Sequence, residues 1–181
     1  MENKQIMKYV NLIKPITYTS YQRMKSKNIK NVEHKHIVFT QKDRKELINQ
    51  MRNQMLSNDE INKRFNEILE EVDILGKKCF EKCEEIHTII IPNKIKKLRH
   101  HSFYKCTNLK SIQLPNKLEE IEYECFSYCP ELTSIQLPES LQKIGCCYGW
   151  NIKELTINCP LSLISNGYFY YCTDITKLEI N

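Results

Sequence analysis

Leu109-Lys-Ser-Ile-Gln-Leu-Pro115 returns 23 residues later as Leu132-Thr-Ser-Ile-Gln-Leu-Pro138. The pattern of apolar first, fourth and sixth positions extends in both directions, and its units start near residues 86, 109, 132, 152 and 175. A fixed period of this length predicts a solenoid, in which each repeat buries its apolar face only against its neighbours. Such an architecture offers an extended surface and does not by itself form a catalytic pocket.

Each unit reads as one coil with two inward-facing legs and a turn. Positions four to six alternate, as in Ile112-Gln-Leu114, which is typical of a short strand. The following proline has no N–H and ends the strand pairing, as at Pro115. Apolar tenth and thirteenth positions favour a return leg, and Phe at the eighteenth with Cys at the twenty-first favours a tight helical turn.

One unit is irregular. The unit from Leu132 is three residues short, because Gly145-Cys-Cys-Tyr-Gly-Trp150 replaces the Phe-x-x-Cys turn. We expect an irregular loop there, with Trp150 or Tyr148 in the space of the missing phenylalanine. Core packing is the favoured interpretation of Trp150, and a ligand-contacting aromatic residue is the alternative.

The region upstream of the repeats predicts helices. Residues 1–71 form the basic N-terminal region, with a first helix over residues 4–14, a loop or ordered arm over 16–38, and a helical hairpin over 41–74. Thr40 with Asp43, and Ser57 with Glu60, have the spacing of capping boxes at the two hairpin helices. We expect the hairpin to cap the first coil. The alternative is a DNA-binding helix-turn-helix, which the acidic second helix disfavours.

The repeats, over residues 72–181, resemble the BspA-like, or Treponema-type, leucine-rich-repeat family. Ile144-Gly145 matches its I-G pair, and Cys125-Phe126-x-x-Cys129 matches its A-F-x-x-C turn with Cys in place of Ala, as in the amoebal branch. A degenerate half-unit precedes them, with Val72, Leu75, Gly76, Cys79, Phe80 and Cys83 in the same frame. The resemblance implies an α/β leucine-rich-repeat solenoid of about four to five coils behind an α-helical N-terminal cap. It also implies protein binding, often cell-surface adhesion, and supplies no catalytic residues.

Charge is unevenly distributed. Residues 1–56 carry 12 Lys and Arg against 4 Asp and Glu, whereas residues 57–85 carry 5 against 9. A nucleic-acid or acidic-membrane partner would therefore have to bind the basic segment. We regard nucleic acid as a disfavoured partner, reached through this basic region if at all.

The nine cysteines are interpreted as small buried thiols, because most stand at inward repeat positions. A structural zinc is the disfavoured alternative, since Cys79 and Cys83 lack Cys-x-x-Cys spacing. We expect the five histidines to lie on the surface. No cofactor, metal or catalytic residue is expected, because the chain has only 4 Gly and no phosphate-cradling loop or nucleophile elbow.

The sequence favours a cytoplasmic location, because it has no long apolar run and no secretory signal at its start. The family resemblance instead allows a peripheral or cell-surface protein. The repeats stop inside a strand half at Asn181, so we expect an exposed apolar end and an open sheet edge. A fragment of a longer array, or self-association through this edge, would account for it.

The function that the sequence favours is a non-enzymatic protein-protein interaction module. The alternatives are an intracellular scaffold and, less favoured, a nucleic-acid-binding protein. The third and fifth strand positions of each unit should point outward on the concave face and contact a protein partner. They are Thr88, Ile90, Ser111, Gln113, Ser134, Gln136, Glu154, Thr156, Lys177 and Glu179.

Overall fold

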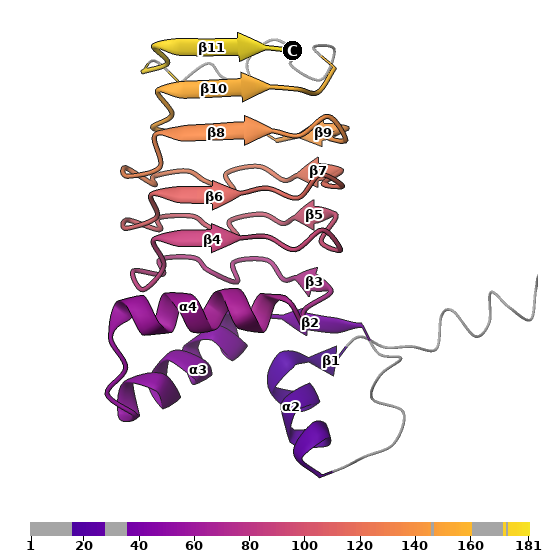
Figure 1. Ribbon diagram of the computed structural model, residues 1–181, viewed down its shortest axis with the longest axis vertical. Coiled ribbons are helices and arrows are strands. Elements are labelled where there is room, and N and C mark those ends of the chain that lie inside the picture. The colour runs from indigo at the N-terminus through magenta and orange to yellow at the C-terminus, as the bar shows by residue number, and fades with distance from the viewer. Residues whose placement is uncertain (1–15, 28–35, 146, 161–171, 173) are drawn as a thin grey trace, which may run out of the picture.

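Strands of successive coils stack in two rows, called here the front sheet and the second sheet, which strand pairing divides into four parallel sheets, with helices at one end (Figure 1). The computed structural model describes residues 16–27, 36–145, 147–160, 172 and 174–181. The front sheet contains β4 (Thr88–Ile90), β6 (Ser111–Gln113), β8 (Ser134–Leu137), β10 (Glu154–Ile157) and β11 (Lys177–Ile180). The second sheet contains β1 (Ile16–Thr17), β2 (Ile37–Phe39), β3 (Ile74–Leu75), β5 (Lys97–Leu98), β7 (Glu120–Ile121) and β9 (Lys143–Ile144). The helices are α2 (Tyr18–Ser26), α3 (Gln41–Asn53) and α4 (Asn58–Leu69).

Every strand pairing is parallel, and the registers in the front sheet follow the repeat. Thr88 stands opposite Ser111, for example, and Glu154 opposite Ser134. The predicted solenoid of short parallel strands is therefore confirmed. Upstream, β2 pairs with both β1 and β3. One sheet therefore contains strands from both sides of the expected boundary at residue 72. The segment over residues 16–38, expected as a loop or ordered arm, thus supplies β1, α2 and β2.

Aromatic rings stack along the core, one from each successive coil. Phe39, Phe80, Phe103 and Phe126 have centroid separations of 5.3, 5.3 and 5.5 Å between successive rings. Trp150 continues the column at 5.4 Å from Phe126, in an edge-to-face arrangement. Of the two residues predicted for the space of the missing phenylalanine, Trp150 fills it and Tyr148 is exposed. Phe169 lies outside the described residues.

The turns before β4, β6 and β8 are tight, but they consist of successive four-residue turns and not of helix. Cys83 N donates to Phe80 O at 3.0 Å, for example. Left-handed backbone recurs at two repeat positions, at Lys78, His101 and Glu124 (φ 60°, 57° and 54°) and at Lys82, Lys105 and Tyr128 (φ 57°, 56° and 59°). These residues interrupt any right-handed helix, because the left-handed conformation is not continued by its neighbours.

The cysteine prediction is confirmed for the eight described cysteines, which are all buried and free of disulfides. Cys106 Sγ and Cys129 Sγ each donate to a backbone oxygen of another coil at 3.0 Å. Burial raises the pKa of the Cys79 and Cys83 thiols to about 12. These thiols are therefore packing groups with little thiolate at neutral pH.

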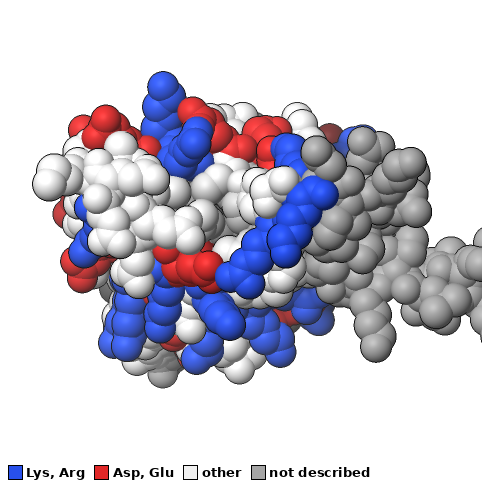
Figure 2. All heavy atoms as spheres, turned by 90° about the horizontal axis from the view of Figure 1, so that it is seen from below, with Lys and Arg blue, Asp and Glu red and all other residues white. Residues whose placement is uncertain are grey.

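The two hairpin helices begin as expected, because both capping boxes form, at Thr40 with Asp43 and at Ser57 with Glu60. Arg44 is buried and donates to the backbone oxygen of Glu81 at 2.7 Å. Seen from the helix-bearing end, Lys and Arg side chains gather along the lower edge (Figure 2). The expected helix over residues 4–14 lies outside the described residues.

A charge ladder crosses the second sheet. The Glu120 carboxylate lies 2.8 Å from Lys143 Nζ and 2.8 Å from Lys97 Nζ, which come from the two flanking coils. Hydrogen bonds from Lys143 and then Lys97 lower the pKa of Glu120 below its usual value of 4.5. The Glu120 side chain is 13 % exposed, so solvent screens this pair only in part.

Replacing Glu120 with Gln should make the free energy of unfolding less dependent on pH. The carboxylate stabilises the fold fully above the unfolded pKa, and this contribution is lost as the pH falls through the lower folded pKa. We expect Glu120→Gln to lower the free energy of unfolding by about 0.5–1 kcal/mol at neutral pH and by less near pH 3. Urea unfolding at several pH values measures this. Glu131→Gln, at an exposed carboxylate, is the control, and an equal loss at both pH values would contradict the ladder.

Candidate protein-binding face

The ten residues expected to point outward do lie on one face of the front sheet. Thr156 is half-buried and the other nine are exposed. Strand pairing places them in two columns along the solenoid, with Thr88 opposite Ser111 and Ile90 opposite Gln113 in the first pair of strands. The same alignment holds from β8 through β11. The structure thus brings all ten together as a regular face, whose binding role stays a prediction.

The chemistry of this face changes along the solenoid. At β4 and β6 it is hydroxylic and apolar, with Ser111 Oγ donating to Thr88 Oγ1 at 3.2 Å and Ile90 45 % exposed. At β11 it is charged, and Lys177 Nζ lies 3.0 Å from Glu179. That ion pair lowers the pKa of Glu179 and raises the pKa of Lys177. The face therefore suits a partner that makes mixed polar and apolar contacts.

The front sheet is split between β6 and β8. Ladder pairing joins β4 to β6, β8 to β10 and β10 to β11, but among the described strands none joins β6 to β8. Figure 1 shows these two strands farther apart than the other neighbouring front strands. A cleft of about 610 Å³ opens there, and Gln113 and Gln136 line it with Ile112, Asn116, Glu139 and Asn158. The split therefore adds a hollow with amide groups to an otherwise even surface.

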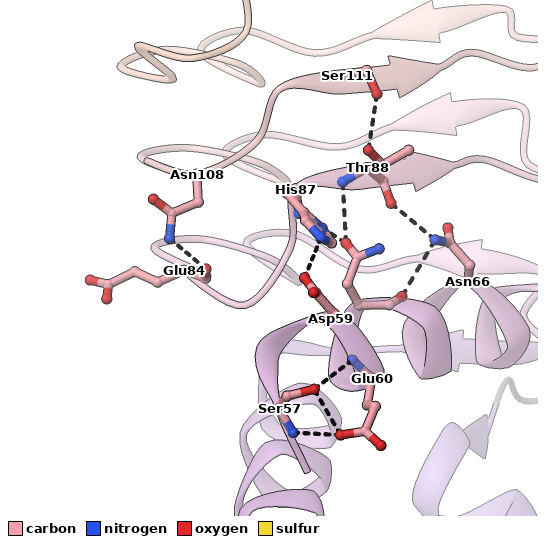
Figure 3. A network of polar contacts seen from close by, with 10 residues as sticks. Ser57, Asp59, Glu60, Asn66, Glu84, His87, Thr88, Asn108 and Ser111 are labelled. Atoms are coloured by element: carbon pink, nitrogen blue, oxygen red, sulfur yellow. Dashed lines mark hydrogen bonds and ion pairs between the residues drawn. The ribbon is translucent and has the colours of Figure 1, made fainter.

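Helix α4 covers the edge of this face at β4, the end strand farthest from β11. Asn62 Oδ1 accepts from the backbone nitrogens of His87 and Thr88 at 2.9 and 3.2 Å. Asn66 Oδ1 accepts from Ile90 N, and its amide nitrogen donates to Thr88 O, both at 2.9 Å. Figure 3 shows Asn66 reaching from α4 to Thr88, with Ser111 one coil further. Two side-chain amides thus take the place of a neighbouring strand.

This pair of asparagines was missed by the sequence reasoning. Their spacing of four residues, which places two side chains on one helical face, was the signal that could have revealed them. His87 belongs to the same network, since its Nε2 lies 2.8 Å from Asp59 (Figure 3). His101 also departs from the expected surface position, because its side chain is 15 % exposed and contacts Glu124 at 2.6 Å.

A metal site, a nucleic-acid interface and a membrane span each place requirements on the described residues. No group of three or more His, Cys, Asp or Glu side chains among the described residues is arranged to hold a metal ion. Two of the cations on α3 are engaged within the protein, since Arg44 is buried and Arg52 lies 2.5 Å from Glu85. Within the described parts of the chain, we find no helix with the length and apolar character that crossing a membrane requires.

Several solved leucine-rich-repeat structures resemble this fold. One from Bacteroides ovatus is 24 % identical over 60 % of this chain and 29 % of its own, with a TM-score of 0.48. A leucine-rich cell surface protein from Faecalibacterium prausnitzii is 21 % identical over 61 % and 30 %, with a TM-score of 0.51. The Treponema pallidum leucine-rich-repeat protein is 25 % identical over 60 % and 63 %, with a TM-score of 0.48. The chain therefore spans less than two thirds of the length of each.

A search of curated proteins found no match. The family model described as the BspA type leucine-rich-repeat region matches residues 49–181 in six copies, which is well over half of the chain. The repeat spacing, the parallel stacking and this match agree. The chain belongs to the BspA-type leucine-rich-repeat family.

Proposed function

We propose that this chain is a non-enzymatic protein-interaction module whose front-sheet face binds a partner protein. The observation that carries the proposal is the cleft at the split between β6 and β8, set in a regular face of outward side chains. Gln113 and Gln136 come from different coils and both line it, so one partner segment would contact two repeats. Amide groups in a cleft give a protein partner directional hydrogen bonds beside the half-buried Ile112.

The test places one positive charge in the cleft. Gln113→Lys and Gln136→Lys should each weaken partner binding by about tenfold or more, because a bound partner would have to desolvate the new ammonium group. Gln142→Lys is the matched control, since Gln142 is exposed beside β9 in the second sheet. Partners are cross-linked in cells to the unaltered chain, identified by mass spectrometry and then titrated with each purified variant. Equal affinity of the cleft variants and the control would refute the assignment to this face.

We also propose a role at the cell surface, as an adhesion or recognition protein. One similar structure is of a protein named as a leucine-rich cell surface protein, which supports this form of the proposal. Labelling of intact cells with a membrane-impermeant amine reagent should then modify the exposed lysines of the chain. Protection from the reagent until the cells are lysed would favour the intracellular scaffold instead.

Self-association through β11 is a further part of the proposal. Leu178 and Ile180 stand opposite the buried Leu155 and Ile157, yet they are 54 % and 51 % exposed. Contact with a second copy would remove this apolar surface from water. Light scattering should show dimers whose fraction rises with concentration, and Leu178→Lys should abolish them. Monomers over the whole concentration range would contradict this proposal.

The division of the chain into an N-terminal region, 1–71, and a repeat region, 72–181, stays a prediction.

A further inference from the structure

The turns that precede the front strands form a separate face, which the expected binding residues do not include. We define the turn face by five residues, Lys82, Tyr104, Lys105, Tyr128 and Tyr148. Lys82, Lys105 and Tyr128 recur at one repeat position, and all three are exposed. All three also have left-handed backbone, with φ between 56° and 59°.

The backbone at this repeat position favours a different residue type. A left-handed conformation costs a residue with a side chain about 1 kcal/mol or more, and it costs glycine little. Gly149, with φ 68°, accepts through its carbonyl oxygen the hydrogen bond from Tyr128 N, as Ser127 O accepts from Lys105 N and Tyr104 O from Lys82 N in the preceding coils. Because Lys82, Lys105 and Tyr128 are exposed, their long side chains add little to the core. The cost of placing them here therefore points to a role outside folding.

The aromatic rings of the turn face are continuous. Tyr104 lies 5.6 Å from Tyr128, and Tyr128 lies 6.1 Å from Tyr148, both edge-to-face. The Lys105 ammonium lies over Tyr104 at 5.3 Å and over Tyr128 at 5.4 Å. Tyr128 is 42 % exposed and Tyr148 is 39 % exposed. Exposed tyrosines in contact with one another are typical of the residues that dominate binding energy at protein interfaces.

The charge that this face leaves unpaired is positive. Among the described residues, the ammonium groups of Lys82 and Lys105 have no acidic partner. Two of the neighbouring carboxylates, by contrast, are engaged within the protein. Glu81 accepts from Gln41 at 3.0 Å, and Glu124 contacts His101 at 2.6 Å.

We propose that the turn face is a second docking surface, which binds an acidic segment of a partner protein. Its carboxylates would pair with Lys82 and Lys105, and the segment would pack against the rings of Tyr128 and Tyr148. Charge complementarity selects the class of partner, and the rings give it a desolvated contact.

A single-stranded nucleic acid is the other ligand that cations and aromatic rings together suggest. Its bases bind by stacking on exposed ring faces. Here the Lys105 ammonium lies over the rings of both Tyr104 and Tyr128, and the rings meet edge-to-face. Stacked bases would have to displace Lys105, whereas a carboxylate can pair with it in place. The geometry therefore favours the acidic peptide.

The experiment measures fluorescence anisotropy of a fluorescein-labelled decaglutamate peptide on the full chain. We expect binding that weakens between about 50 and 200 mM salt. Lys82→Gln with Lys105→Gln should lower the affinity by about tenfold. Lys117→Gln, on the loop between β6 and β7, removes an exposed lysine elsewhere and should change the affinity by less than about twofold.

Tyr128→Asn tests the rings without weakening the fold. Asparagine adopts left-handed backbone more readily than tyrosine, so the variant should unfold at the same temperature or higher. We expect it to bind the peptide severalfold more weakly. Lys82→Asn, at the equivalent position two coils earlier, shows how much of any thermal shift comes from the backbone alone.

Three results would overturn the proposal. They are no binding of decaglutamate, an equal loss of affinity in Lys117→Gln and in the double variant, and tighter binding of a ten-nucleotide oligothymidylate that depends on the same lysines. The residues of the front-sheet face take no part in this test. Failure here therefore leaves the front-sheet proposal standing, and failure there leaves the turn face standing.

Discussion

The column of aromatic rings along the core is the constraint on which the remaining structure depends. Successive rings from Phe39 to Trp150 lie 5.3–5.5 Å apart, close to the separation of about 4.8 Å between neighbouring strands. One ring per coil can therefore stack while the strands pair, provided that each coil returns its ring to the same place. The repeat length meets this condition, and the short coil meets it by replacing phenylalanine with the larger Trp150.

The same constraint explains why the helices belong to the solenoid. The column starts at Phe39 in β2, so a segment outside the repeat supplies the first ring. Asn62 and Asn66 then supply hydrogen bonds to β4 where a preceding front strand would otherwise be needed. One end of the core and one edge of the front sheet are closed by different means, and both come from residues upstream of the first full repeat.

The features that could be predicted from the sequence are those that repeat along it or that depend on a local motif. The parallel strands, the buried thiols, the capping boxes and Trp150 were all predicted, because each depends on spacing or on a local motif. Phe39, Asn62 and Asn66 stand outside the period, so only the folded chain shows what they contact. The split between β6 and β8 is less accessible still, since the two strands share the sequence Ser-Ile-Gln-Leu-Pro and yet do not pair. The sequence of the two strands therefore does not explain why they fail to pair, and the cause must lie in the coils around them.

Separation of core from surface is what allows this fold to carry two unlike faces. Inward side chains must fit the ring column and allow the strands to pair, whereas neither requirement limits the outward side chains. On the front sheet the outward residues lie on regular strands at little conformational cost. Their residue types alone are therefore weak evidence of a binding role. On the turn face, Lys82, Lys105 and Tyr128 occupy left-handed backbone that glycine would adopt more cheaply. A side chain kept at a conformational cost, and exposed to water, is stronger evidence of binding than one that costs nothing.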